Sequence, residues 1–111
     1  MTINEYQKLA MTTLNKDLTK DEMLLNALMG LNGEAGEAID LMKKHLFHGH
    51  GLDTDRLVRE LGDIAWYLAE AATALGIGLE DILKGNVDKL KARYPEGFDT
   101  LRSQNRAEGD N

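Results

Sequence analysis

The sequence predicts an all-α protein, an antiparallel four-helix bundle. Apolar residues recur every three or four positions in four successive segments, which is the spacing of amphipathic helices. A polar loop and two glycine-containing turns separate these segments, the single proline follows the last of them, and no segment alternates as a strand would. A chain of 111 residues has the length of one domain. We therefore expect one helical domain over residues 1–98 and an extended or disordered tail over residues 99–111.

The first predicted helix covers residues 3–14, and a polar loop over residues 15–20 follows it. The second helix begins near Thr19, because Thr19 and Glu22 have the spacing of a capping box, although Asp21 is an alternative cap. Its apolar stripe consists of Leu24, Leu28, Leu31, Ala35, Ala38 and Met42. Gly30, Gly33 and Gly36 each cost about 1 kcal/mol relative to Ala within a helix. We expect a neighbouring helix or a ligand to approach them closely.

The third predicted helix follows a turn that contains Gly49 and Gly51. Asp53 or Thr54 caps it, and Gly76 ends it. Its apolar stripe consists of Leu57, Leu61, Ile64, Leu68, Ala71 and Leu75. Trp66 lies beside this stripe, where a chain of this size has little to cover it. We therefore expect a subunit interface at Trp66.

The fourth predicted helix covers residues 79–94 and is ended by Pro95. Asn86, Lys89 and Arg93 share one face of it, next to the apolar face. Such a face is often only solvated surface. Opposite an acidic metal site, it would instead reach phosphate oxygens.

Composition restricts the classes of partner. The net charge of −6 argues against a nucleic-acid-binding protein, because phosphate backbones require a basic surface. It is compatible with a small phosphate ligand that is bound through a cation. The chain has no cysteine, no apolar run long enough for a membrane span and no signal peptide pattern at its start, so we expect a cytoplasmic protein.

Two pairs of carboxylates are the strongest functional signal. Glu34 and Glu37 lie three residues apart on the second helix, and Glu60 and Asp63 lie three residues apart on the third. Each pair projects from one helix face, and both pairs lie at a similar distance from the intervening turn. One such pair alone usually means solvated surface. Four carboxylates that meet between antiparallel helices require a cation or a proton.

The ligand types favour Mg²⁺, with Mn²⁺ as a possible substitute, because all four candidates offer oxygen. A di-iron bundle would need a Glu-x-x-His spacing, which neither pair has. His45, His48 and His50 have no fourth ligand nearby for a structural zinc site. A place near the substrate, or simple solvation, fits these histidines better.

Together these residues resemble the MazG-like group of the all-α nucleoside triphosphate pyrophosphohydrolase superfamily. The family pattern ExxE, spacer, ExxD reads here as Glu34-Ala35-Gly36-Glu37 and Glu60-Leu61-Gly62-Asp63. The block Asn86-x-x-Lys89-Leu90-x-x-Arg93-Tyr94-Pro95-x-Gly97-Phe98 is similar to the family's second signature. Glu5-Tyr6-Gln7 and His48-Gly49 also resemble short members, so the likeness covers roughly residues 3–98.

This resemblance implies a Mg²⁺-dependent enzyme that hydrolyses (deoxy)nucleoside triphosphates to monophosphates and pyrophosphate in nucleotide-pool housekeeping. It implies a homodimer or homotetramer, with Glu34, Glu37, Glu60 and Asp63 as catalytic metal ligands. The residues implied to contact the nucleotide are Asn86, Lys89, Arg93 and Tyr94. The alternative is a non-catalytic nucleotide or metal sensor, or an assembly protein, on the same bundle.

Overall fold

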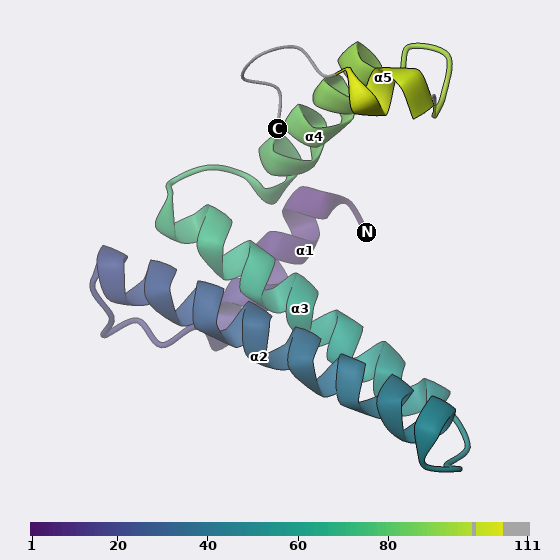
Figure 1. Ribbon diagram of the computed structural model, residues 1–111. Helices are drawn as coiled ribbons and strands as arrows, with labels where there is room; N and C mark the ends of the chain where they lie inside the picture. The colour runs from purple at the N-terminus through teal and green to yellow at the C-terminus, as the bar shows by residue number, and fades with distance from the viewer. Residues whose placement is uncertain (99, 106–111) are drawn as a thin grey trace. The chain divides into compact units, whose positions relative to one another are not determined.

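The computed structural model describes residues 1–98 and 100–105. These residues form helices joined by turns and contain no β-strand, which confirms the predicted all-α class (Figure 1). The elements are α1 (Ile3–Ala10), the 3₁₀ turn η1 (Met11–Thr13), α2 (Lys20–Phe47), α3 (Thr54–Ala74), α4 (Leu79–Arg93) and α5 (Thr100–Gln104). No helix among the described residues is long and apolar enough to cross a membrane.

Local capping chemistry sets the ends of the two long helices. The hydroxyl of Thr19 accepts a hydrogen bond from the backbone N–H of Glu22 at 3.2 Å, and the Thr19 N–H donates to the Glu22 carboxylate at 2.9 Å. This capping box confirms the predicted start of α2. Asp53 caps α3 by accepting from the backbone N–H of Arg56 at 3.0 Å. Gly76 follows α3 with φ +73°, the left-handed conformation that glycine adopts at a helix end.

Helices α2 and α3 lie side by side in opposite directions, joined by the turn over residues 48–53 (Figure 1). Small residues line the contact: Ala27 is 1% exposed, and Ala69 and Ala72 are fully buried. The ring of Tyr67 lies against Gly30. The absence of a side chain at Gly30 therefore lets the two helices pack closely, as the sequence predicted for this glycine. Gly33 and Gly36 have no such neighbour within 4 Å among the described residues.

The apolar stripes predicted for α2 and α3 coincide only in part with the faces along which the helices pack. Leu28 on α2 is 55% exposed and Leu61 on α3 is 53% exposed, although both were expected inside. The face of α2 that meets α3 instead follows the line of Ala27, Gly30 and Glu34. Both helices carry apolar residues on two faces, and the face with the smaller residues allows the closer approach.

The N-terminal segment packs on α3 and contacts Trp66, where the sequence predicted a subunit interface. The indole N–H of Trp66 donates to the carbonyl of Ala10 at 2.9 Å and to the hydroxyl of Thr13 at 3.0 Å. The Gln7 amide donates to the Thr73 hydroxyl at 3.1 Å. The chain itself therefore covers part of Trp66, so this residue does not require a subunit interface.

The described residues from Glu80 onward form a second compact unit, and Met1–Leu79 form the first. Within the second unit, α4 ends before Pro95, as predicted. Thr100–Gln104 form the short helix α5, whereas the sequence predicted an extended or disordered tail from residue 99 onward. Leu101 and Gln104 are good helix formers, and the Asn105 N–H continues the pattern by donating to the Leu101 carbonyl at 2.9 Å. The rest of the predicted tail, residues 99 and 106–111, lies outside the described residues.

Candidate functional site

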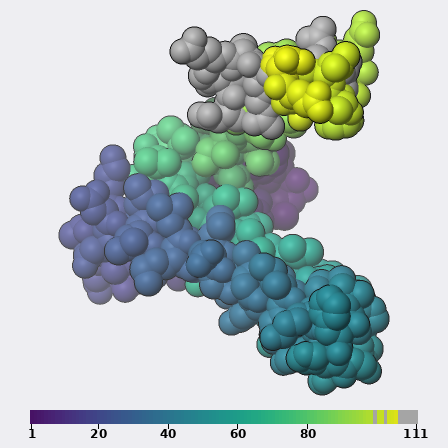
Figure 2. Space-filling model, in the orientation of Figure 1, coloured from purple at the N-terminus to yellow at the C-terminus, as the bar shows by residue number. Residues whose placement is uncertain are grey.

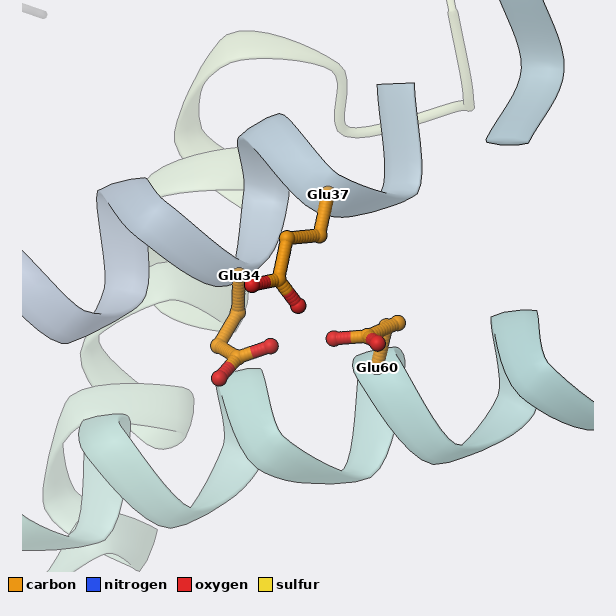
Figure 3. A group of neighbouring side chains, drawn as sticks. All are labelled: Glu34, Glu37 and Glu60. Carbon is orange, nitrogen blue, oxygen red and sulfur yellow. The ribbon is translucent and has the colours of Figure 1, made fainter. Parts of the chain in front are cut away.

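Three glutamates converge between the two long helices. Glu34 and Glu37 project from α2, and Glu60 projects from the facing side of α3 (Figure 3). One carboxylate oxygen from each lies within 4.8 Å of the other two. Glu60 is only 8% exposed although it carries a charge. The antiparallel pairing thus brings three of the four carboxylates named by the sequence into one group.

Asp63, the fourth candidate, lies outside this group but next to it. It follows Glu60 by just under one turn of α3 and is exposed. It lines a cavity together with Glu34, and its charge contributes to raising the pKa of Glu34. The arrangement is therefore a tight group of three carboxylates with a fourth at its edge.

The carboxylates of the glutamate group alter one another's pKa values. A hydrogen bond to the Glu60 carboxyl, burial, and the charges of Glu37, Glu60 and Asp63 raise the pKa of Glu34 to about 7. A hydrogen bond from the Glu34 carboxyl lowers the pKa of Glu60, and the nearby Arg56 guanidinium adds to the effect. Of these two carboxyls, Glu34 therefore holds a proton more readily than Glu60, and that proton relieves the repulsion within the group.

The group also fits a divalent cation. Glu34 Oε2 and Glu60 Oε2 are buried and, when both carboxylates are ionised, have no hydrogen-bond donor among the described residues. Buried anionic oxygens of this kind are costly unless a proton or a cation compensates them. Because all the available donors are oxygens, the group suits a hard cation such as Mg²⁺ or Mn²⁺.

An aromatic cavity adjoins the glutamates. Its volume is about 400 Å³, and its lining residues are Thr13, Glu34, Asp63, Trp66 and Tyr67. The rings of Trp66 and Tyr67 meet edge to face with centroids 5.2 Å apart. Burial raises the pKa of the Tyr67 phenol, and the negative charge of Glu34 adds to the effect. Sequence reasoning missed Thr13 and Tyr67, although Tyr67 follows Asp63 by four residues and so shares its helix face.

The contact between Gly30 and Tyr67 predicts a localised effect of substitution. A Cβ atom at position 30 would overlap the Tyr67 ring, whereas one at position 33 would meet nothing within 4 Å. We expect Gly30→Ala to displace Tyr67 from the cavity wall and to lower the thermal midpoint. Gly33→Ala, the matched control, should stabilise the protein by about 0.5–1 kcal/mol through helix propensity. Thermal unfolding and Trp66 fluorescence measure both effects, and equal behaviour of the two variants would contradict this packing.

The remaining candidates lie elsewhere in the chain. His45 Nδ1 lies 2.9 Å from the carbonyl oxygen of His50, at the turn between α2 and α3. The four residues that the family resemblance assigns to the nucleotide are Asn86, Lys89 and Arg93 on α4 and Tyr94 just after it. The Tyr94 ring contacts that of Phe98, with centroids 5.5 Å apart. These four residues belong to the second unit, so their contact with a nucleotide stays a prediction.

Comparison with known proteins gives two findings. Residues 22–98 match the sequence model of a family described as the MazG nucleotide pyrophosphohydrolase domain. The chain is also 39% identical over 85 residues to the "Gene 37 protein" of Mycobacterium phage L5, a match that covers 73% of this chain and 75% of that protein. No solved structure matches the chain. The family match includes all four carboxylates and the four α4-region candidates.

Proposed function

The chain belongs to the MazG nucleotide pyrophosphohydrolase family, and from this premise we propose that it hydrolyses (deoxy)nucleoside triphosphates to nucleoside monophosphate and pyrophosphate. The observation that carries the proposal is the convergence of Glu34, Glu37 and Glu60 from two helices within the matched region. We propose that the enzyme acts as a homodimer or homotetramer in nucleotide-pool housekeeping. The exposed apolar side chains of α2 and α3, such as Leu28 and Leu61, support an assembly of this kind.

Members of this family usually use a divalent metal, and we propose Mg²⁺ here, with Mn²⁺ as a possible substitute. Glu34, Glu37 and Glu60 would hold the ion, with Asp63 as a further ligand. When bound there, the ion would neutralise triphosphate oxygens and lower the pKa of a coordinated water. One of the glutamate carboxylates accepts the proton of the attacking water, which is general-base catalysis.

Two sets of residues would orient the substrate. The aromatic cavity of Trp66 and Tyr67 borders Glu34 and has the size and rings to receive the base and sugar. From α4, Asn86 and Lys89 would contact the nucleotide, and Lys89 would stabilise negative charge that develops on the phosphates. Arg93 and Tyr94 complete the proposed binding set.

A product analysis tests the proposal. The full-length protein is incubated with a panel of ribo- and deoxyribonucleoside triphosphates and Mg²⁺, and the products are separated by ion-exchange chromatography. We expect nucleoside monophosphate and pyrophosphate in equal amounts. Release of nucleoside diphosphate and phosphate would contradict the proposed bond cleavage. Nucleotide binding without any release would instead support the alternative of a nucleotide sensor.

A further inference from the structure

A second cavity lies near the turn between α2 and α3. This turn is at the teal end of the helical pair in Figure 2. The cavity has a volume of about 340 Å³, and we call it the turn pocket. Its lining residues are Leu41, Lys44, His50, Gly51, Asp53 and Arg56. Two basic side chains, Lys44 from α2 and Arg56 from α3, therefore border a single cavity. Asp53 opposes them, but one of its oxygens already caps α3.

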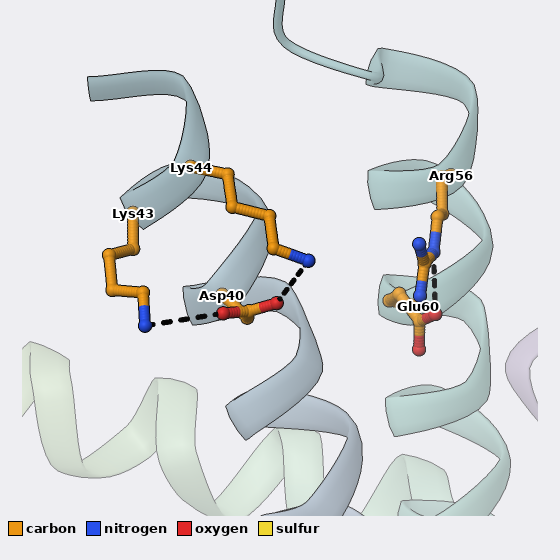
Figure 4. Close-up of polar contacts among 5 residues, drawn as sticks. All are labelled: Asp40, Lys43, Lys44, Arg56 and Glu60. Carbon is orange, nitrogen blue, oxygen red and sulfur yellow. Dashed lines mark ion pairs between the residues drawn. The ribbon is translucent and has the colours of Figure 1, made fainter. Parts of the chain in front are cut away.

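Lys44 and Arg56 line the turn pocket from different helices, α2 and α3. The Lys44 ammonium lies 3.0 Å from Asp40 and extends toward α3, whereas Lys43 binds the same carboxylate at 3.5 Å and points away (Figure 4). Arg56 Nε lies 3.8 Å from Glu60, which is longer than a hydrogen bond. The Arg56 guanidinium thus borders both the turn pocket and the glutamate group, and it keeps donors available for another anion.

The turn pocket, the glutamates and the aromatic cavity follow one another along the helical pair. On α3, the spacing of Arg56, Glu60, Asp63 and Tyr67 places these residues on one face. The antiparallel helix α2 carries the matching residues. From the turn pocket toward the aromatic cavity these are Lys44, Glu37, Glu34 and Gly30. The rise of a helix separates Arg56 from Tyr67 by about 16 Å along the axis, a distance comparable to an extended nucleoside triphosphate.

We propose that the turn pocket binds the β- and γ-phosphates of the substrate, the part released as pyrophosphate, through Lys44 and Arg56. This inference rests on the proposed function and adds the orientation of the substrate: phosphates toward the turn, base toward Trp66. Guanidinium and ammonium groups bind phosphate oxygens through charge-assisted hydrogen bonds. His50 lines the same pocket and offers a further donor. Ion pairing within each helix would account for the contacts Lys44–Asp40 and Arg56–Glu60. It would not account for the position of Lys44 and Arg56 on the same cavity, next to the glutamates.

The test measures the affinity of inorganic pyrophosphate for the full-length protein by titration calorimetry with Mg²⁺ present. Lys44→Gln and Arg56→Gln should each weaken pyrophosphate binding by about tenfold or more, the usual effect of losing a charged hydrogen bond. Lys43→Gln is the matched control, because it removes the same charge from the same ion-pair cluster outside the pocket. Lys44→Arg should restore binding, and deoxynucleoside monophosphate should bind all variants about equally.

Three results would contradict phosphate binding in the turn pocket. They are unchanged pyrophosphate affinity in both glutamine variants, an equal loss of affinity in Lys43→Gln, and no pyrophosphate binding by the wild-type protein. Thermal unfolding of each variant checks that the fold is retained. The outcome is separable from that of the proposed function. Wild-type hydrolysis with unaffected variants rejects only the pocket, whereas the expected binding pattern without any hydrolysis rejects only the enzyme activity.

Discussion

Replacing Glu60 by Gln is expected to lower triphosphate hydrolysis by at least about a hundredfold, because even outer-shell partners of metal sites cost 10- to 100-fold when changed. Glu60 is the most buried of the three glutamates, and it is the one that α3 supplies. Glutamine keeps the shape of the side chain but removes its charge. Because the surroundings lower the pKa of Glu60 and so favour its ionised form, the metal-free variant should unfold at a somewhat lower temperature than the wild type.

The measurement combines kcat at saturating Mg²⁺ with the Mg²⁺ dissociation constant. Asp21→Asn is the control, because Asp21 is an exposed carboxylate in the first turn of α2 outside the glutamate group. It should retain wild-type activity. Full activity in Glu60→Gln, or an equal loss of activity in Asp21→Asn, would show that the glutamate group is not the active site.

Removal of divalent metal should abolish hydrolysis, and added Mg²⁺ should stabilise the fold more at high pH than at low pH. The folded-state pKa of Glu34 is raised from 4.5 to about 7. For a raised pKa, the contribution to stability is fully present below the unfolded value and is lost as the pH rises through the folded value. The metal-free protein should therefore lose stability between about pH 4.5 and pH 7. Mg²⁺ competes for the same oxygens, so its stabilising effect grows over this range.

Thermal unfolding with and without Mg²⁺ at about pH 5.5 and about pH 8 measures how the stabilisation by Mg²⁺ depends on pH. Most of the expected loss of stability falls between these two pH values. Glu34→Gln is the informative variant, because it removes the group that titrates. Its metal-free stability should depend less on pH than that of the wild type. Equal stabilisation by Mg²⁺ at both pH values would show that the cation binds elsewhere.

The sequence predicted the parts of this fold that local chemistry determines. The capping box of Thr19 and Glu22 and the cap at Asp53 are contacts between residues three apart, so the ends of α2 and α3 can be inferred from a short window. Helical periodicity likewise set Glu34 and Glu37 on one face at the height of Glu60. The convergence of these three carboxylates followed once the two helices were taken as antiparallel.

Longer-range packing could not be predicted in the same way. The hydrogen bond of Trp66 to Ala10 joins residues 56 positions apart, and no short pattern indicates it. The choice of packed face was also ambiguous, because both faces of α2 carry apolar residues. Close packing at Ala27 and Gly30 favoured one face and left Leu28 exposed.

The central claim is that Glu34, Glu37 and Glu60 hold the cation that engages a nucleoside triphosphate. A crystal structure with Mg²⁺ and a non-hydrolysable deoxynucleoside triphosphate tests it most directly. We expect Mg²⁺ bonded to oxygens of these three glutamates, with Asp63 as a further ligand, the base beside Trp66 and the terminal phosphates toward Lys44 and Arg56. A cation bound away from the three glutamates, or a nucleotide that does not touch the α2–α3 pair, would contradict the claim.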